Sequence, residues 1–390
     1  MNTPLTIDAL ERAMRNDELV LYYQPKVCLL RGKVVGAEAL VRWSHGVSDV
    51  VSPDKFLPLV ESSGLLHDLT LNLLDQVVEA SIALKAHDPK LSLSINVAPN
   101  DLASRTISNR IAQLLEAKTI CADDLQIEIT ESAVMGNVDR VYDDLIRLKD
   151  MGIKILMDDF GTGYSSIDRL SQLPFDALKL DQGVVRRMST SRQNLDVVRA
   201  AISMARELNM TSVAEGVESA GVYNFLIAHG CEEAQGYYIA RPMSLTDFKA
   251  FIADAHDFSG SQIGRVHQAC LNLMRFRKTL LDAAFCTRVG DGIALQSVAD
   301  PGLHKDVTLS RIGLWYFGAG QALNEQPTFR QIEQPLRELH ASGLRFLKLL
   351  EDTGPTVELD QILADTDQQV DSVLALFHQL ERLLLVQARR

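Results

Sequence analysis

Two adjacent acidic residues end an apolar segment in the middle of the chain. The segment KILMDDFGTG covers residues 154–163, and its apolar residues lead directly into Asp158 and Asp159 and then into a glycine-spaced turn. A structural turn needs only one carboxylate, and two neighbouring carboxylates repel each other. We therefore expect a positively charged partner at this point of the chain.

Further polar residues stand at the ends of other apolar segments. They are Glu38 in GAEALVRW, Asn96 in SINVA, Glu128 and Glu131 in IEITES, Lys179 in LKLD, Glu215 in VAEGVE and Gln235 in AQGYY. A single carboxylate at such a place is most often a helix cap or a turn residue. A succession of them is not explained in this way, because acids buried together are strongly unfavourable unless cations neutralise them.

The residue types indicate which cations these would be. The candidate ligands offer carboxylate and amide oxygens, without histidine or cysteine, and such ligands favour Mg²⁺ or Mn²⁺. A carboxylate able to bridge, with others on either side, favours two ions about 3.5–4 Å apart, an arrangement suited to attack on a phosphodiester. Bound cations would also reverse the local potential, so that an acidic protein can hold an anionic substrate.

Two basic residues fit the same chemistry but have simpler alternatives. Lys179 can stabilise an attacking water molecule, or it can form a salt bridge with Asp181 or another neighbouring acid. Arg42 follows Glu38 by four residues and can bind a phosphate group through two hydrogen bonds, or it can form a surface ion pair. The residue pattern leaves both alternatives open.

The elements that must position these residues alternate between strand and helix. We predict strands at residues 19–30, 34–43, 91–98, 125–132, 153–160, 177–182, 211–217 and 234–240. Helical patterns between them predict a parallel sheet, and this number of strands predicts an α/β fold with a closed (β/α)₈ barrel. The first two strands are too close for a helical crossover, so we expect them to be antiparallel. In such a barrel the candidate residues would meet at the C-terminal ends of the strands.

The pattern changes after a Gly-, Ser- and Asp-rich break at residues 254–264. Later segments have helical apolar spacing, and the first of them would bury Ile263, Val266, Leu273, Leu280 and Leu281 on one face. We therefore predict a barrel domain at residues 1–257 and a separate all-α bundle of about four helices at residues 258–390.

The bulk composition restricts the class of protein. The formal net charge of −12 argues against binding of nucleic-acid polymers and of anionic membranes. The cysteines are scattered and odd in number, which is typical of free thiols in a reducing cytoplasm: Cys28, Cys121, Cys231, Cys270 and Cys286. The N-terminus does not resemble a signal peptide, and no apolar run approaches the ~18 residues of a membrane span. We expect a cytoplasmic protein.

Taken in order, the motifs resemble those of the EAL-domain cyclic di-GMP phosphodiesterases, bacterial enzymes that linearise this second messenger to pGpG. The resemblance covers residues 18–250 and includes the signature Glu38-Ala39-Leu40, which is weak alone. It is accompanied by YYQP, SPDKFLPLVESSGLL, SINV, EITES, DDFGTGYSS, LKLD, AEGVE and QGYYIARP. The departures are small: Ala98 stands where the family usually has serine.

The resemblance implies a role for each candidate residue. It implies one Mg²⁺ or Mn²⁺ ion held by Glu38, Asn96, Glu128 and Asp158, and a second held by Asp158, Asp159 and Glu215. The residues nearest the chemistry would be Glu38, Asp159, Lys179 and Glu215, with Lys179 on the attacking water. Substrate contacts would come from Leu40, Arg42 and Gln235.

The family match also implies how the site is controlled. Glu131 would anchor the loop FGTGYSS, which links the metal site to a dimer contact, so we expect a homodimer. Ca²⁺ is expected to inhibit, because it is larger than Mg²⁺ and takes more ligands in looser geometry. Two alternatives are a non-hydrolytic cyclic di-GMP receptor that acts through the bundle, and a scaffold with a vestigial barrel. The intact set of ligands disfavours both.

The C-terminal segment has a weaker resemblance to the CZB domain, a small helical zinc sensor with a C-x-x-G-x-W segment and a later H-x-x-x-H. Gly313 and Trp315 match this pattern, but Ser310 stands at the cysteine position. Leu336 stands at the first histidine of the pair, and His340 at the second.

Zinc binding by this segment would need other donors. His267 or Met274 stands near the place of an earlier ligand, and Cys270 and Cys286 could substitute for the missing ones. A zinc site needs four nitrogen or sulfur donors, and two histidines with a serine hydroxyl do not provide them. We expect a bundle without zinc that serves regulation or dimerisation.

Overall fold

The computed structural model describes residues 5–45, 49–131, 138–161, 170, 173–254, 256, 258, 260–289, 306–353 and 357–387. The chain divides into two compact units. The first comprises Met1–Cys28, Lys33–Val222 and Glu233–Phe258, and the second comprises Leu29–Gly32, Tyr223–Glu232 and Ser259–Arg390. The predicted assignment of residues 1–257 and 258–390 to separate domains remains a prediction.

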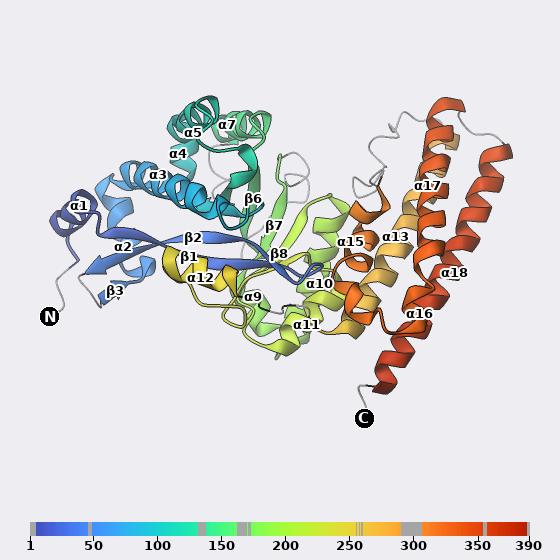
Figure 1. The fold of residues 1–390 in the computed structure, drawn as a ribbon. Helices are drawn as coiled ribbons and strands as arrows, with labels where there is room; N and C mark the ends of the chain where they lie inside the picture. The colour runs from blue at the N-terminus through green and yellow to red at the C-terminus, as the bar shows by residue number, and fades with distance from the viewer. Residues whose placement is uncertain are drawn as a thin grey trace. The chain divides into compact units, whose positions relative to one another are not determined.

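The first unit contains a closed barrel (Figure 1). Its strands are β1 (Leu19–Cys28), β2 (Lys33–His45), β4 (Ser92–Asn96), β5 (Leu125–Thr130), β6 (Lys154–Phe160), β7 (Ala177–Leu180), β8 (Thr211–Ala214) and β9 (Glu233–Ala234). Each strand pairs with the next in this order, and β9 returns to β1. Strand β1 is antiparallel to both of its neighbours, and the other pairs in the ring are parallel. The predicted barrel with an antiparallel first pair is confirmed.

The β1–β2 ladder is longer than the others and extends past the barrel. Strand β4 pairs with β2 only over Gly36–Ala39, whereas β1 continues to pair with β2 as far as Trp43. Strand β3 (Asp49–Val51) pairs with the outer end of β2, at Trp43–His45. The outer half of β2 is therefore held by hydrogen-bonded ladders rather than by loops.

Helices connect the parallel strands. They include α3 (Leu66–Lys85), α5 (Thr106–Glu116), α7 (Val138–Asp150), α10 (Arg192–Glu207) and α11 (Ala220–His229), and shorter or flanking helices are α1 (Ile7–Arg15), α2 (Pro53–Ser63), α4 (Pro99–Ala103), α9 (Gln182–Arg187) and α12 (Leu245–Ala253). Helix α10 buries Val198, Ile202 and Ala205 at helical spacing. Asp181 caps α9 by accepting hydrogen bonds from the backbone of Gly183 and Val184. Asp181 thus serves as a helix cap.

The prediction of a strand at residues 234–240 was wrong beyond its first residue. Strand β9 ends at Ala234. A Cβ atom at Gly236 would lie 2.2 Å from the backbone of Val217, so the two backbones approach too closely for any other side chain. The chain turns there, with Ile239 N–H donating to the Gly236 carbonyl. The apolar residues that suggested a strand belong to this turn.

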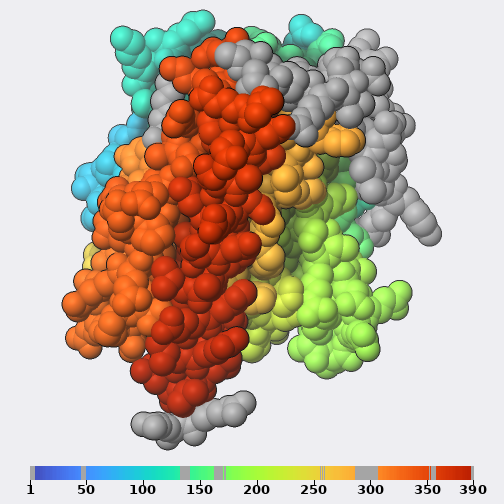
Figure 2. All heavy atoms as spheres, turned by 90° about the vertical axis from the view of Figure 1, so that its right-hand side faces the viewer, coloured from blue at the N-terminus to red at the C-terminus, as the bar shows by residue number. Residues whose placement is uncertain are grey.

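The described residues of the second unit are mostly helical, as predicted for the C-terminal part of the chain. Its long helices are α13 (Gln262–Val289), α17 (Glu333–Thr353) and α18 (Val357–Gln387), and its short ones are α15 (Arg311–Tyr316) and α16 (Pro327–Arg330). Figure 2 shows α17 and α18 side by side along one face of this unit. The core includes Leu273 and Trp315, whose ring meets Phe329 and Phe377 edge to face at 5.7 and 5.6 Å. Leu281, predicted in the core, is 44% exposed, whereas its neighbour Leu280 is buried.

The residues that resemble the CZB pattern have structural roles in this unit. Ser310 caps α15 by accepting a hydrogen bond from Gly313 N–H. A Cβ atom at Gly313 would lie 1.7 Å from the Val307 carbonyl oxygen, which explains the glycine. His340 is buried on α17, and His267 lies 3.5 Å from Glu381 of α18.

Two further observations bear on the sequence predictions. Burial raises the pKa of the Cys270 thiol to about 12. The side chain of Cys286 lies outside the described residues. The expectation that this unit does not bind zinc stays a prediction. None of the helices in the described ranges combines the length and the apolar character that crossing a membrane would require.

Candidate active site

The register of the barrel brings the predicted residues together. Glu38 on β2 lies opposite Gln24 on β1, and Asn96 at the end of β4 lies beside Glu128 on β5. Asp158 on β6 lies beside Thr130 on β5. Because the parallel strands end at the same mouth of the barrel, side chains that are far apart in sequence become neighbours.

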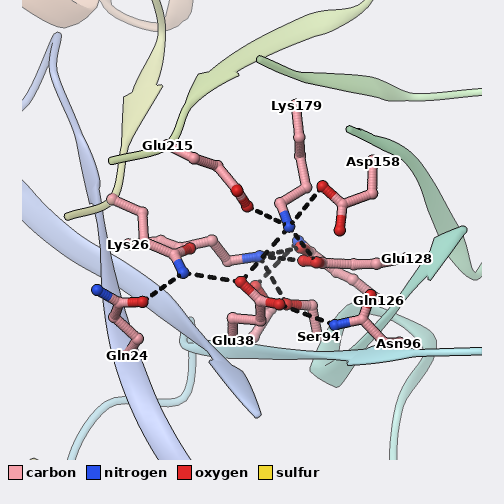
Figure 3. A network of polar contacts seen from close by, with 12 residues as sticks. Gln24, Lys26, Glu38, Ser94, Asn96, Gln126, Glu128, Asp158, Lys179 and Glu215 are labelled. Atoms are coloured by element: carbon pink, nitrogen blue, oxygen red, sulfur yellow. Dashed lines mark hydrogen bonds and ion pairs between the residues drawn. The ribbon is translucent and has the colours of Figure 1, made fainter. Parts of the chain in front are cut away.

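Lys179 is at the centre of the acidic residues (Figure 3). Its side chain on β7 is fully buried. The Nζ atom lies 3.1 Å from Asp158 Oδ1, 2.5 Å from Glu215 Oε1 and 3.4 Å from Glu38 Oε2, and it also pairs with Glu128 Oε2. The alternative of a salt bridge to a neighbouring acid is therefore present in the structure, with these four carboxylates as partners rather than Asp181. The Lys179 ammonium group is thus a positively charged partner of Asp158, of the kind that the sequence led us to expect.

Two amides fix the orientation of Glu38. Asn96 Nδ2 donates to Glu38 Oε1 at 2.8 Å, and Gln235 Nε2 donates to Glu38 Oε2 at 2.7 Å. Gln235 Nε2 also donates to Gln24 Oε1 at 3.0 Å. The Asn96 amide uses its nitrogen in this bond, so its oxygen is the atom that can coordinate a cation.

A second lysine lies deeper in the barrel and was not predicted. Lys26 Nζ on β1 donates to Ser94 Oγ at 3.0 Å and to Gln126 Oε1 at 2.9 Å, and it lies 3.4 Å from Glu128 Oε1. The signal that could have found this layer is a period of two residues. Each residue of this deeper layer stands two residues from a residue at the mouth on the same strand. The pairs are Lys26 with Gln24, Ser94 with Asn96, and Gln126 with Glu128.

Burial and charge act in opposite directions on these carboxyl groups. Burial raises the pKa of Glu38 and of Asp158 even though Lys179 lowers both, and it raises the pKa of Glu215 to about 8. Burial also acts to raise the pKa of Glu128, but Lys179 and Lys26 together outweigh it and hold that pKa at about 2. Glu128 is thus the most firmly ionised member of the group.

The donor set fits divalent cations. Glu38, Glu128 and Asp158 each place one carboxylate oxygen so that all three oxygens lie within 4.8 Å of one another. The carboxylates around Lys179 outnumber the two lysines, four against two, and leave a formal charge of −2 when all are ionised. Gln235 Oε1 is buried and has no hydrogen-bond partner among the described residues. Hard cations with their water would satisfy both the charge and this oxygen.

Asp159 directly precedes the loop FGTGYSS, and Glu131, which follows β5, contacts that loop. Asp159 is half-buried and has a φ of 59°, a left-handed conformation that few residues other than glycine adopt. Its backbone N–H donates to Asp158 Oδ1 at 2.8 Å. Glu131 Oε2 accepts from Gly161 N–H at 3.4 Å, so Glu131 contacts the second residue of the loop. Residues 162–169 lie outside the described residues.

Leu40 and Arg42 lie on the outer part of β2 and do not join the polar network. Leu40 is half-buried opposite Tyr22. The Arg42 guanidinium donates to the Val41 carbonyl and lies 5.9 Å from the centre of the Tyr22 ring. Their predicted contacts with a substrate remain predictions.

These features define a class of protein: a closed α/β barrel with a buried, carboxylate-lined site at the C-terminal ends of its strands. A family model described as the EAL domain matches residues 7–242, more than half of the chain. The chain belongs to the EAL domain family.

The chain is similar to several characterised proteins. Cyclic di-GMP phosphodiesterase RocR of Pseudomonas aeruginosa is 38% identical over 232 residues, which are 60% of this chain and 59% of that protein. Cyclic di-GMP phosphodiesterase NbdA of the same organism is 36% identical over 247 residues, 63% of this chain and 31% of that protein. The chain thus spans less than two thirds of either relative. The solved structure of the PaMucR phosphodiesterase in complex with c-di-GMP has a TM-score of 0.59 and 33% identity, covering 62% of this chain and 98% of that one.

Proposed function

We propose that this protein hydrolyses cyclic di-GMP to linear pGpG with two divalent cations, Mg²⁺ or Mn²⁺. The observation that carries the proposal is the convergence of Glu38, Glu128 and Asp158, which come from three strands and place their oxygens within 4.8 Å. Membership of the EAL domain family and the names of the similar proteins support the choice of substrate.

Each predicted ligand has a part in this proposal. Glu38, Asn96, Glu128 and Asp158 would hold one cation, and Asp158 with Asp159 and Glu215 would hold the other. Bound cations would neutralise the phosphodiester and lower the pKa of a water molecule. Asp158 is the ligand shared by the two proposed cations, and its Oδ1 atom lies 3.1 Å from Lys179 Nζ. The ammonium group would therefore be close to an atom bound by the ligands of both cations.

The remaining residues of the chain orient the reactants. Lys179 donates hydrogen bonds at the centre of the site, where an attacking water molecule would be held in place and negative charge would develop. Gln235 fixes Glu38 through its nitrogen and offers its buried oxygen to that water or to substrate. Leu40 and Arg42 would contact the nucleotide, with Arg42 reaching a phosphate group.

The rest of the proposal concerns regulation. Glu131 holds Gly161, the second residue of the loop after Asp159, so movement of that loop would be transmitted to the site. We assign the barrel to residues 1–257 and a regulatory or dimerisation bundle to residues 258–390, and we expect a homodimer in the cytoplasm.

The test is incubation of the full chain with cyclic di-GMP in Mg²⁺, in Mn²⁺ and in EDTA, with separation of the products by chromatography. Linear pGpG in both metals and none in EDTA is the expected result. Binding of cyclic di-GMP without any product would instead identify a receptor. Absence of both binding and product would identify a barrel with no role in this chemistry.

A further inference from the structure

Lys26 is a charged side chain in a place where charge is costly. It lies on β1, inside the barrel and one layer below the mouth, and it is 1% exposed. Its contacts are Ser94 Oγ at 3.0 Å, Gln126 Oε1 at 2.9 Å and Glu128 Oε1 at 3.4 Å (Figure 3). Burial of an ammonium group is tolerated only when acceptors of this kind surround it.

The two buried lysines are held by different kinds of acceptor. Lys179 pairs with the carboxylates of four residues, and the proposed cations would bind to the same carboxylates. Lys26 has a hydroxyl and an amide oxygen as its closest partners, and only one carboxylate. Cations would therefore compete with Lys179 for its partners, while the two neutral acceptors would keep Lys26 in place.

The carboxylate of Glu128 is divided between the two lysines. Lys26 lies beside Oε1, and Lys179 contacts Oε2. Glu128 is fully buried, so water does not reach its oxygens from the surface. When a cation takes the place of Lys179 at Oε2, Lys26 still holds Oε1 and with it the rotation of the carboxylate.

We propose that Lys26 is a positioning residue for the reaction proposed above. It holds Oε1 of Glu128 from below, so that the carboxylate presents Oε2 to the cation side of the site. This inference rests on the proposed phosphodiesterase function. It assigns a role to the residue that directly follows the YYQP motif of its strand.

The first test is Lys26→Met in the full chain. A residue that orients a metal ligand without touching the metal typically changes activity by ~10–100-fold, so kcat should fall by about that factor. The KM for cyclic di-GMP should stay within about threefold, because Lys26 lies below the site and does not touch substrate. Mn²⁺ titration of the substrate-free protein should show a dissociation constant about tenfold lower, because one positive charge has been removed beside a cation site.

This combination separates positioning from a structural role. A purely structural lysine would lower kcat and Mn²⁺ affinity together, or neither, and either result would overturn the proposal. Turnover within about threefold of wild type would also overturn it, whatever the Mn²⁺ affinity. The matched control is Lys149→Met, which removes a lysine paired with Asp176 at 2.5 Å before the start of β7, away from the mouth. Its kcat and Mn²⁺ affinity should match those of the wild type.

A second variant keeps the test decisive if Lys26→Met does not fold. Ser94→Ala removes one of the neutral acceptors of Lys26 with almost no change in volume. It should lower kcat less than Lys26→Met does and leave KM unchanged; unchanged kcat would refute the role of Lys26. If the wild type itself makes no pGpG, the proposed function fails. The Mn²⁺ titration then still decides whether Lys26 acts on the cation site.

Discussion

Removal of the Lys179 ammonium group should destabilise the metal-free protein strongly. In Lys179→Met, four buried carboxylates lose their common partner. Breaking a buried ion pair by removing one partner costs about 3–5 kcal/mol. For a domain of this size each kcal/mol lowers Tm by about 2–4 °C, so we expect Tm in EDTA to fall by ~10 °C.

Divalent cations and low pH should both reduce this deficit. Cations would replace the missing positive charge, so Mg²⁺ or Mn²⁺ should raise Tm more for the variant than for the wild type. The pKa of Glu215 is raised from 4.5 to about 8 in the folded wild type. A raised folded pKa gives stability that is present below the unfolded pKa and is lost as pH rises through the folded one. Removal of Lys179 raises this pKa further, so the deficit should be smaller near pH 5 than at pH 8.

The assay is thermal unfolding at several pH values, with and without metal. The control is Lys154→Met, which removes a lysine from an exposed pair with Asp123 and should cost less than about 1 kcal/mol. An unchanged Tm for Lys179→Met in EDTA at pH 8 would show that the four carboxylates do not depend on this ammonium group. An equal response of both lysine variants to metal would refute the assignment of the cation site.

Four further outcomes follow from the site and the bundle. Glu38→Ala should lower kcat by at least ~10²–10³-fold, and near-normal turnover in Mg²⁺ would mean that the metal assignment is wrong. Ca²⁺ should support binding of cyclic di-GMP, measured by calorimetry, but not its cleavage; rapid cleavage in Ca²⁺ alone would contradict this. Glu131→Ala should lower kcat by ~10²-fold with unchanged Mn²⁺ binding, and normal kinetics would leave the loop contact without a functional role. The zinc content of the full chain after dialysis should be the same for wild type and His340→Ala; zinc lost only from the variant would identify a zinc site in the bundle.

Much of the fold could be predicted from the sequence because local pattern and tertiary structure agree there. Strands with continuous apolar residues and polar ends, such as 154–160, indicate parallel strands whose ends meet in one place. The same reasoning found Glu38, Glu128, Asp158 and Lys179, which the structure brings together.

The predictions that were wrong or missing depend on contacts between segments, which the pattern of one segment does not show. The turn at Gly236 depends on the backbone of Val217, a contact between two segments. Lys26 was not predicted because only residues at strand ends were considered, whereas Lys26 lies one layer inside the barrel. In addition, β1 runs in the opposite direction to its neighbours. Leu281 fits the apolar spacing of α13 but lies at the edge of the stripe, since Leu280 takes the buried position.

The extended β1–β2 ladder fixes the spacing of the side chains along β2. Glu38, Leu40 and Arg42 stand at two-residue intervals on β2, so their side chains share one face. At about 3.3 Å per residue, Arg42 lies roughly 13 Å along the strand from Glu38. Strand β1 pairs with β2 along this whole segment, from Gln24–Glu38 to Val20–Arg42, without a shift in register. The spacing between Glu38 and Arg42 is thus set by strand geometry. If the proposed function is correct, a ligand that contacts both side chains has to match this spacing.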